Sequence, residues 1–166
     1  MSSIAIIDYG MGNLRSVAKA LEYVAPHTQV RITQNRHDIL HADRVVFPGQ
    51  GSIRDCMREL AQLDLVDVVR EAAHSKPFLG LCLGPQALLE FSEENGGVDC
   101  LKVLPRRVVW FGDPRDPVSG ERLKVPHMGW NQVYQTHDHP LWQGIPQDSR
   151  FYFVHSYYLR PANKSL

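Results

Sequence analysis

Short apolar runs rich in β-branched residues alternate along the chain with stretches whose apolar residues recur every three or four positions. The runs predict strands and the stretches predict helices, an order typical of βα units around a mainly parallel sheet. Up to Gly97 the predicted strands are 4–7, 30–32, 44–47 and 78–81, the last being fully buried, and the predicted helices are 14–24, a short piece at 38–40, 65–73 and 85–91. The segment 48–51 predicts a turn outside any regular element, and Ser52 then predicts a helix cap.

Beyond Gly97 the pattern changes, since strands are predicted without intervening helices. They cover Lys102–Phe111, Val125–Gln135 and Phe151–Leu159, with a loop over 112–120 that contains Pro and Gly residues. Such a series favours an antiparallel or mixed arrangement. Because no repeat and no long linker interrupts the chain, residues 1–166 are expected to form one domain.

Composition narrows the class of protein. The chain has 166 residues, with 18 Lys and Arg against 18 Asp and Glu, and 43% of its residues are hydrophobic. The zero net charge argues against nucleic-acid binding, which needs clustered basic residues. No apolar stretch is long enough to span a membrane and the N-terminus has no basic start, so a cytoplasmic protein is expected. Three cysteines without metal-type spacing make a disulfide framework improbable and direct attention to single thiols.

The sharpest local pattern surrounds Cys82. A predicted strand leads into this cysteine, a helix follows it, and Gly80 and Gly84 flank it at two residues on either side. A nucleophile elbow needs such small neighbours, because the strand must turn tightly into the helix while it lifts the nucleophile above the sheet. The helix start favours the thiolate, and the amide of Leu83 is then a donor for an oxyanion. The alternative is a small buried apolar cysteine at a strand end. Cys56, inside a helical stretch, and Cys100, next to an apolar run, are expected to be core or surface residues without chemistry.

Gly49-Gln50-Gly51 is a second candidate, at the carboxyl end of another predicted parallel strand, where ligands of open α/β sheets bind. Its amides are candidate oxyanion donors, and the alternative is an ordinary loop. Gly10-Met11-Gly12 lacks the third glycine of a dinucleotide fingerprint, so no such cofactor is expected. His137-Asp138-His139 suggests no third ligand and is interpreted as a solvated turn, so no metal is expected either.

Five sequence blocks together resemble the glutaminase subunits of imidazole glycerol phosphate synthases, which are class I glutamine amidotransferases of histidine biosynthesis. The blocks run from the first predicted strand to the last: Ile7-Asp8-Tyr9-Gly10-Met11-Gly12-Asn13-Leu14, Phe47-Pro48-Gly49-Gln50-Gly51, Gly80-Leu81-Cys82-Leu83-Gly84, Pro126-His127-Met128-Gly129-Trp130-Asn131 and Phe151-Tyr152-Phe153-Val154-His155-Ser156-Tyr157. The resemblance implies an α/β, flavodoxin-like three-layer class I glutamine amidotransferase fold with a mixed sheet.

The same resemblance implies an enzyme without cofactor that hydrolyses L-glutamine to glutamate and ammonia through a cysteine thioester. Cys82 matches the nucleophile, and Leu83, Gln50 and Gly51 match the oxyanion hole. The residues that match the glutamine-binding set are Gly49, Gln86, His155 and Ser156. The family's partner is a (βα)8-barrel cyclase, which receives the ammonia in a heterodimer. Asn13, Met128 and Trp130 are expected at that interface.

The chain departs from the family at three places. Gln50 replaces a small aliphatic residue, Pro85 replaces methionine, and no His-Pro-Glu segment, which supplies the family's base, follows the His155 strand. We therefore expect a domain that lacks its C-terminal strands and helix, and a nearly inactive enzyme. One alternative is a final core strand with a polar tail over 161–166. Another is a catalytically dead binding module that docks on the cyclase, and a different cysteine hydrolase is a more distant possibility.

Overall fold

A computed structural model describes residues 2–160 of the chain. Within this range, residues 2–109 with 159 and 160 form a first compact unit, and residues 110–158 form a second. The polar tail expected over 161–166 lies outside the described residues. Unit 1 holds the predicted βα region and unit 2 holds most of the later strands, so each is described in turn.

The first sheet of unit 1 consists of four parallel strands in the order β2-β1-β3-β4. The strands are β1 (Ser3–Ile7), β2 (Gln29–Thr33), β3 (Arg44–Gly49) and β4 (Phe78–Cys82). Each predicted strand of the first half is therefore present. Because the strands are parallel, the carboxyl ends of β1, β3 and β4 lie along one edge of the sheet.

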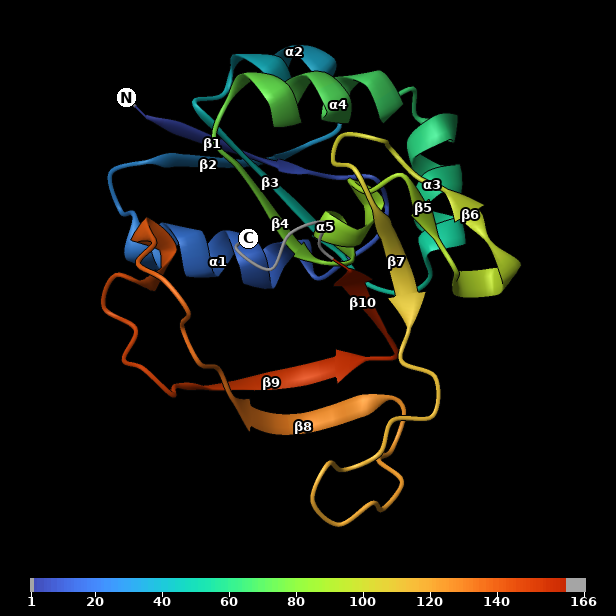
Figure 1. Cartoon of the computed structure of the whole chain (residues 1–166). Helices are drawn as coiled ribbons and strands as arrows, with labels where there is room; N and C mark the ends of the chain where they lie inside the picture. The colour runs from blue at the N-terminus through green and yellow to red at the C-terminus, as the bar shows by residue number, and fades with distance from the viewer. Residues whose placement is uncertain (1, 161–166) are drawn as a thin grey trace. The chain divides into compact units, whose positions relative to one another are not determined.

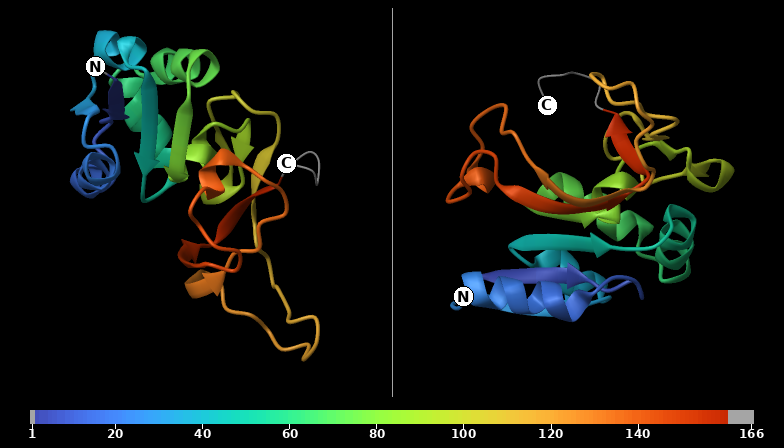
Figure 2. Two further views of the ribbon diagram at one scale, coloured as in Figure 1. Left: turned by 90° about the vertical axis from the view of Figure 1, so that its left-hand side faces the viewer. Right: turned by 90° about the horizontal axis from the view of Figure 1, so that it is seen from below.

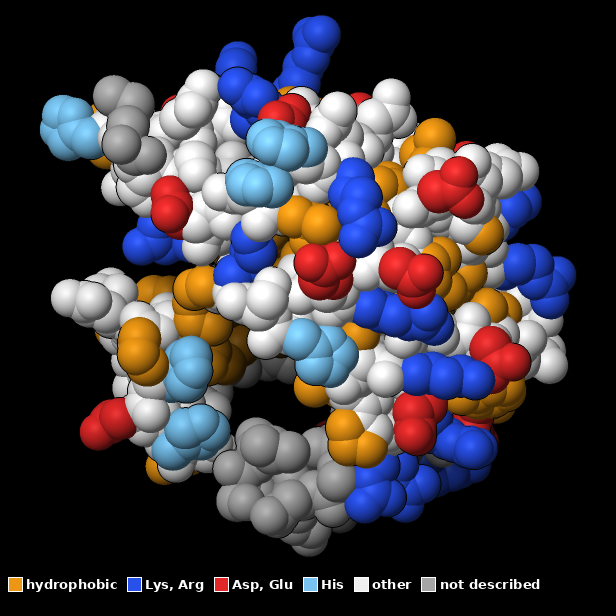
Figure 3. All heavy atoms as spheres, turned by 90° about the horizontal axis from the view of Figure 1, so that it is seen from above, with side chains coloured by type: hydrophobic (Ala, Val, Ile, Leu, Met, Phe, Trp, Pro, Cys, Tyr) orange, Lys and Arg blue, Asp and Glu red, His pale blue; other side chains and the backbone are white. Residues whose placement is uncertain are grey.

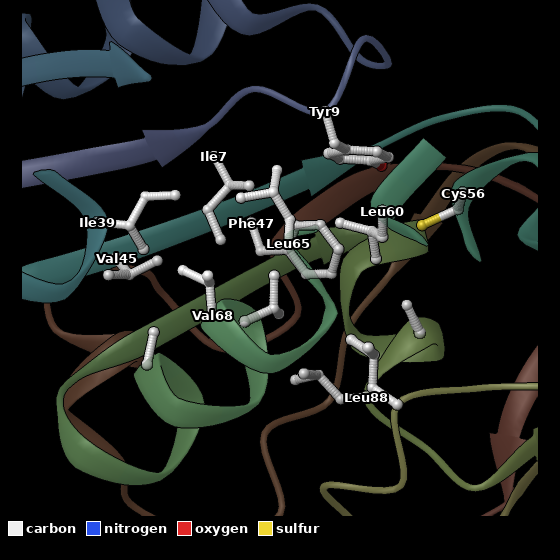
Figure 4. Close-up of a cluster of buried hydrophobic side chains, with 14 of the residues drawn as sticks. Ile7, Tyr9, Ile39, Val45, Phe47, Cys56, Leu60, Leu65, Val68 and Leu88 are labelled. Atoms are coloured by element: carbon white, nitrogen blue, oxygen red, sulfur yellow. The ribbon is translucent and has the colours of Figure 1, made fainter. Parts of the chain in front are cut away.

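Helices cover both faces of this sheet, as Figure 1 shows. They are α1 (Leu14–Val24), α2 (Arg36–His41), α3 (Ile53–Gln62), α4 (Val66–Ser75) and the short α5 (Leu83–Ala87). Side chains alternate along β1, so Ile4 and Ile6 pack with Ala18 of α1, whereas Ala5 and Ile7 enter the larger core beneath α2, α3 and α4. Figure 4 shows part of this larger core. The result is the three-layer α/β arrangement expected from the sequence.

Local side chains start three of these helices, and the starts of α1 and α3 lie at the predicted places, whereas α2 begins two residues before the predicted piece at 38–40. Asn13, Asn35 and Ser52 each precede a helix and accept a hydrogen bond from the backbone amide three residues on, at 3.2–3.3 Å. Ser52 also donates to the Asp55 carboxylate at 2.8 Å, which completes a reciprocal cap on α3. Buried Ile53, Cys56 and Leu60 then face the core from α3.

The remaining elements are β5 (Phe91–Ser92), η1 (Glu94–Gly96), β6 (Val98–Asp99), β7 (Arg107–Trp110), β8 (His127–Gln132), η2 (Pro140–Trp142), β9 (Arg150–His155) and β10 (Tyr157–Arg160). A second sheet has the order β10-β7-β5-β6, in which β5 pairs parallel to β7 and antiparallel to β6. In unit 2, β8 and β9 form an antiparallel ribbon, visible in both views of Figure 2. The expected mixed arrangement is therefore confirmed.

The predicted turn at 48–51 is partly wrong, because Pro48 and Gly49 continue β3 and pair with Leu81 and Cys82 of β4. A proline is tolerated there because the pairing of β3 with β1 ends at Val46, so its missing N–H costs no bond on that side. Strand β4 is also half-buried and not fully buried as predicted, since it lies at the edge of the four-stranded sheet.

The predicted helix over 85–91 and the early part of the predicted strand over 102–111 are also corrected. Helix α5 ends at Ala87, and β7 begins only at Arg107. The Ala87 carbonyl, which a helix through residue 91 would pair with the Phe91 amide, accepts from the Leu101 amide at 2.8 Å. The Leu88 carbonyl accepts from the amides of Val103 and Leu104 at 2.9 Å. These long-range bonds use backbone groups that a longer helix or strand would need.

The predicted strand over 151–159 is two strands, β9 and β10, separated by a bend at Ser156. The predicted strand over 125–135 is shorter than expected and covers only His127–Gln132. In the range 2–160 no helix is long and apolar enough to cross a membrane. Basic and acidic side chains intermingle on the face seen in Figure 3. Arg36 of α2 and Glu71 of α4 form an ion pair at 3.0 Å.

Candidate active site

Cys82 occupies a sharp strand-to-helix turn in unit 1. It is the last residue of β4 and the residue before α5, and its side chain is exposed. Its backbone has φ 54° and ψ −96°, a conformation that residues other than glycine rarely adopt. The strained turn and the exposed thiol have the geometry of a nucleophile elbow, as the sequence pattern predicted.

Crowding explains the glycines around this turn. A Cβ atom on Gly80 would lie 2.7 Å from the Pro85 nitrogen, and one on Gly84 would overlap the Phe47 carbonyl oxygen. These contacts are too short for a real side chain. The two glycines therefore let α5 pack directly against β3 and β4, and this close packing holds Cys82 at the turn.

The Gly49–Gly51 segment lies beside the thiol. Gly49 is the register partner of Cys82, and a Cβ atom on Gly49 would lie 2.9 Å from the Leu83 Cβ. Gln50 and Gly51 follow in an exposed stretch, with Gly51 at φ +87°. The structure thus brings together Cys82, the start of α5 and the second candidate segment on one sheet edge.

Tyr9 lies beneath this arrangement and was not among the residues singled out from the sequence. Its side chain is fully buried, and its hydroxyl lies 2.5 Å from the position that a Cβ on Gly49 would take. Within the described residues this hydroxyl has no hydrogen-bond partner. Burial, followed by the neighbouring Cys56 and Cys82 thiols, raises the pKa of Tyr9 far above its usual range. Because Tyr9 is buried directly against Gly49, there is no room for a side chain at position 49.

The other two thiols are buried in unit 1. Cys56 belongs to α3, and Cys100 follows β6. Burial raises the pKa of Cys56 to about 12 and that of Cys100 to about 11. Both remain protonated near neutral pH, so Cys82 is the accessible thiol of the chain.

Gln86 and Asn13 also belong to unit 1. Gln86 lies in α5, four residues after Cys82 and half-buried, so it shares a helix side with the start of the helix. Asn13 is exposed, and its side-chain oxygen caps α1 by accepting from the Ser16 amide. This capping role of Asn13 was not predicted from the sequence. The role predicted for Asn13 was at the interface with the partner.

His155 and Ser156 belong to unit 2, at the end of β9 and at the bend before β10. His155 Nε2 is 3.0 Å from Nδ1 of His127, its register partner on β8, and His155 Nδ1 is 3.0 Å from the Tyr157 carbonyl oxygen. His127 belongs to one of the five sequence blocks, but no role was predicted for it. Its place opposite His155 follows from the register of β8 with β9, which the pattern of one strand alone does not reveal.

Met128 and Trp130 lie on the other face of the ribbon. Register pairs Met128 with Val154 and Trp130 with Tyr152, and the rings of Trp130 and Tyr152 meet edge to face with centroids 5.5 Å apart. All four side chains are at least 55% exposed. Unit 2 therefore presents an apolar strip, defined as Met128, Trp130, Tyr152 and Val154, of a kind that marks interaction surfaces.

The described residues show no arrangement for a metal: between residues 2 and 160 no three His, Cys, Asp or Glu side chains group together. His137 and His139 face each other edge-on with ring centroids 6.5 Å apart. His139 caps η2 by accepting from the Leu141 amide. These histidines thus have a local structural use in the turn.

Comparison with known proteins gives consistent matches. The family described as glutamine amidotransferase class-I matches residues 5–166. The imidazole glycerol phosphate synthase subunit HisH of Nitrosococcus oceani is 61% identical over 166 residues, which is 100% of this chain and 77% of that protein. The protein of the same name from Aromatoleum aromaticum is 58% identical over 100% of this chain and 78% of its own length.

Solved structures agree on the fold. A crystal structure of a glutamine amidotransferase matches with a TM-score of 0.64 and 14% identity, over 97% of this chain and 75% of that one. A glutamine amidotransferase from Thermotoga maritima matches with a TM-score of 0.57 and 15% identity, over 96% of this chain and 62% of that one. At such identities the match concerns the fold alone.

Proposed function

The chain belongs to the class-I glutamine amidotransferase family, and on that premise we propose that it is the glutaminase subunit of an imidazole glycerol phosphate synthase. The observation that carries the proposal is an exposed thiol on a strained strand-to-helix turn, in a chain about 60% identical to subunits of that name. The reaction is the hydrolysis of L-glutamine to glutamate and ammonia in histidine biosynthesis, and we expect it in the cytoplasm.

Cys82 is the proposed nucleophile. Its thiolate attacks the side-chain carboxamide carbon of glutamine, so a C–S bond forms and the carbonyl oxygen becomes an oxyanion. When the oxyanion collapses, the C–N bond breaks, the amide nitrogen takes up a proton that balances the one lost by the thiol and departs as ammonia, and a glutamyl thioester remains. Water then attacks the thioester, which releases glutamate and restores the thiol.

The oxyanion hole is assigned to backbone amides around the turn. Leu83 supplies the amide that directly follows the nucleophile, and Gln50 and Gly51 supply candidates from the segment that Gly49 holds beside Cys82. Backbone donors fixed in a crowded turn need little reorganisation when charge develops on the substrate oxygen. Neither departure at this site, Gln50 or Pro85, removes one of these N–H groups.

Glutamine binding is assigned to Gly49 and Gln86 of unit 1 and to His155 and Ser156 of unit 2. The partner is a (βα)8-barrel cyclase, which forms a heterodimer with this chain, receives the ammonia and gives the complex its lyase chemistry. Asn13 and the apolar strip are assigned to that interface, since the strip leaves four large side chains exposed on one face of the ribbon.

Covalent labelling tests the nucleophile. The chain is treated with a glutamine analogue that carries a chloroketone in place of the carboxamide, and the modified cysteine is located by peptide mass spectrometry. We expect one adduct on Cys82, prevented by excess L-glutamine, and none on Cys56 or Cys100, whose buried thiols stay protonated.

Iodoacetamide provides the matched control, because it reacts with any accessible thiolate. If glutamine fails to protect Cys82 from the analogue and both reagents label it alike, Cys82 is an exposed thiol without a glutamine site. That result would contradict the proposed function. Cys82→Ala, which should take up neither reagent, shows that the label is on this residue.

Substitution of Trp130 tests the partner surface. Trp130→Glu should weaken binding to the cyclase subunit of Nitrosococcus oceani by about thirtyfold or more, as expected for a buried tryptophan at the centre of an interface. Val118→Glu is the control, since Val118 is 95% exposed on the 112–126 loop of the same unit and lies outside the apolar strip. Equal affinities for Trp130→Glu and the parent chain, measured by calorimetry, would remove the assignment.

A further inference from the structure

Ser156 forms a bend whose backbone is held from both sides. Its carbonyl accepts from the Phe111 amide at 3.1 Å, and across it the His155 ring reaches the Tyr157 carbonyl at 3.0 Å. The ring of His155 thus links residues on either side of Ser156 and determines the angle at which β9 continues into β10.

The hydrogen bonds determine which ring nitrogens carry protons. A carbonyl oxygen can only accept, so Nδ1 of His155 is the donor to Tyr157. In the neutral ring Nε2 is then an acceptor, and Nδ1 of His127, 3.0 Å away, must donate to it. The three residues therefore form a directed chain from His127 through His155 to the Tyr157 carbonyl.

Aromatic packing holds both rings in place. His127 stacks on Phe153 with centroids 4.9 Å apart, and His155 meets Phe111 edge-on at 4.9 Å. Both histidines are half-buried. Since both nitrogens of His155 are engaged within unit 2, its ring offers no unused polar atom to a ligand.

A hollow of about 1230 Å³ in unit 2 is lined by His127, Ser156 and Tyr157, whereas His155 does not line it. Ser156 therefore lines this hollow, whereas His155 is linked to it through the backbone of the bend. This separates the roles of the two neighbours His155 and Ser156, which the family resemblance assigned together to glutamine.

We propose that His127 is a positioning residue for glutamine binding: it fixes the ring of His155, and His155 braces the Ser156 backbone that meets the substrate. The inference rests on the proposed function, which assigns Ser156 to glutamine. It requires no contact between His127 and the substrate. Loss of the hydrogen bond from His127 should weaken glutamine binding without altering the reactivity of the bound complex.

Two variants separate the hydrogen bond from the packing. His127→Phe keeps a ring against Phe153 and removes the donor, whereas His127→Asn places an amide N–H near the position of Nδ1 and removes the ring. With the chloroketone analogue, we expect His127→Phe to raise the inhibition constant about twofold to tenfold, as for loss of one neutral hydrogen bond, with the maximal rate of labelling unchanged. His127→Asn should stay close to the parent.

Imidazole ¹⁵N chemical shifts provide a readout independent of labelling. We expect His155 to be protonated at Nδ1 in the parent chain and in both variants, because the Tyr157 carbonyl can only accept, and we expect the shift of the unprotonated Nε2 to change in His127→Phe, which lacks the donor, and not in His127→Asn. In a His155→Phe background, His127→Phe should have no further effect on the inhibition constant. Thermal unfolding of each variant establishes that it is folded.

Several results would overturn the inference. One is an unchanged inhibition constant in His127→Phe, and another is an equal rise in both His127 variants, which would show that keeping the donor does not preserve binding. A His155 ring protonated at Nε2 in the parent chain would contradict the directed chain itself. If the parent chain is not labelled at Cys82, the proposed function fails, while the Nε2 shifts of His155 in the two variants still decide whether His127 donates to His155.

Discussion

The strained backbone at Cys82 makes a prediction about stability that is separate from catalysis. At φ 54° and ψ −96° a side chain is disfavoured, whereas glycine adopts such angles readily. Cys82→Gly should therefore give a more stable protein than Cys82→Ala. Both variants lack the thiol, and the exposed position leaves little buried surface to lose, so the comparison isolates the backbone.

The size of the difference follows from two opposing effects. A residue held in a sparsely populated backbone region costs about 1–3 kcal/mol, and glycine removes that cost. Glycine also has a more flexible unfolded state, which costs about 0.5–1 kcal/mol relative to alanine. The balance leaves glycine more stable by about 1 kcal/mol, equivalent to a melting temperature higher by about 2–4 °C in a chain of this size.

Urea unfolding followed by far-ultraviolet circular dichroism measures this difference. The signal is chosen because the α-helices described in residues 2–160 all lie in unit 1 with Cys82, whereas Trp110, Trp130 and Trp142 report on unit 2. If Cys82→Gly is no more stable than Cys82→Ala, the backbone at residue 82 is not strained and the prediction is wrong.

Three further predictions concern packing and charge in unit 1. Gly84→Ala should lower the yield of folded protein sharply, because its Cβ would overlap the backbone of Phe47. Gly96→Ala is the control: no atom lies within 4 Å of its Cβ, so its free energy of unfolding should fall by only about 1–2 kcal/mol, the cost of a side chain at positive φ. Equal losses of stability in urea unfolding would show that crowding at Gly84 has no effect. Tyr9→Phe should stabilise the fold by about 1 kcal/mol, since it removes a buried hydroxyl without a partner, and a loss of stability would reveal a partner. The amide of Ser3, and then its hydroxyl, hold the pKa of Asp43 below its usual value. This folded-state pKa lies below the unfolded value of about 3.9, so the carboxylate stabilises the protein above that pH and the effect is lost as the pH falls through the lower value. Asp43→Ala should thus be less stable than the parent at pH 7 and equal to it in strong acid, and a pH-independent difference in melting temperature would contradict this.

The turn at Cys82 could be predicted because its determinants are local. Glycine two residues to either side of the cysteine, an apolar run before it and a helix start after it are all visible in the sequence. The same holds for the helix cap at Ser52, since Ser52 acts on an amide three residues away. Where a residue and its partner are neighbours in the chain, pattern and structure agree.

The predicted boundaries of helices and strands are wrong where the hydrogen-bond partners that determine them are distant in the chain. Helix α5 ends early because the Ala87 carbonyl accepts from the Leu101 amide, which is fourteen residues away in the chain. The bend at Ser156 interrupts a continuous apolar run and depends on hydrogen bonds from His155 and Phe111. The site residues themselves come from separate strands, so their juxtaposition needs the sheet order as well as the motifs.

The register of β8 with β9 determines which side chains lie on each of the two faces of the ribbon. His127 opposite His155 faces one way, and Trp130 opposite Tyr152 faces the other. Inserting or deleting a single residue within either strand would exchange these faces from that point on, because successive side chains point to opposite sides. A change in the length of either strand that keeps both surfaces must therefore come in steps of two residues.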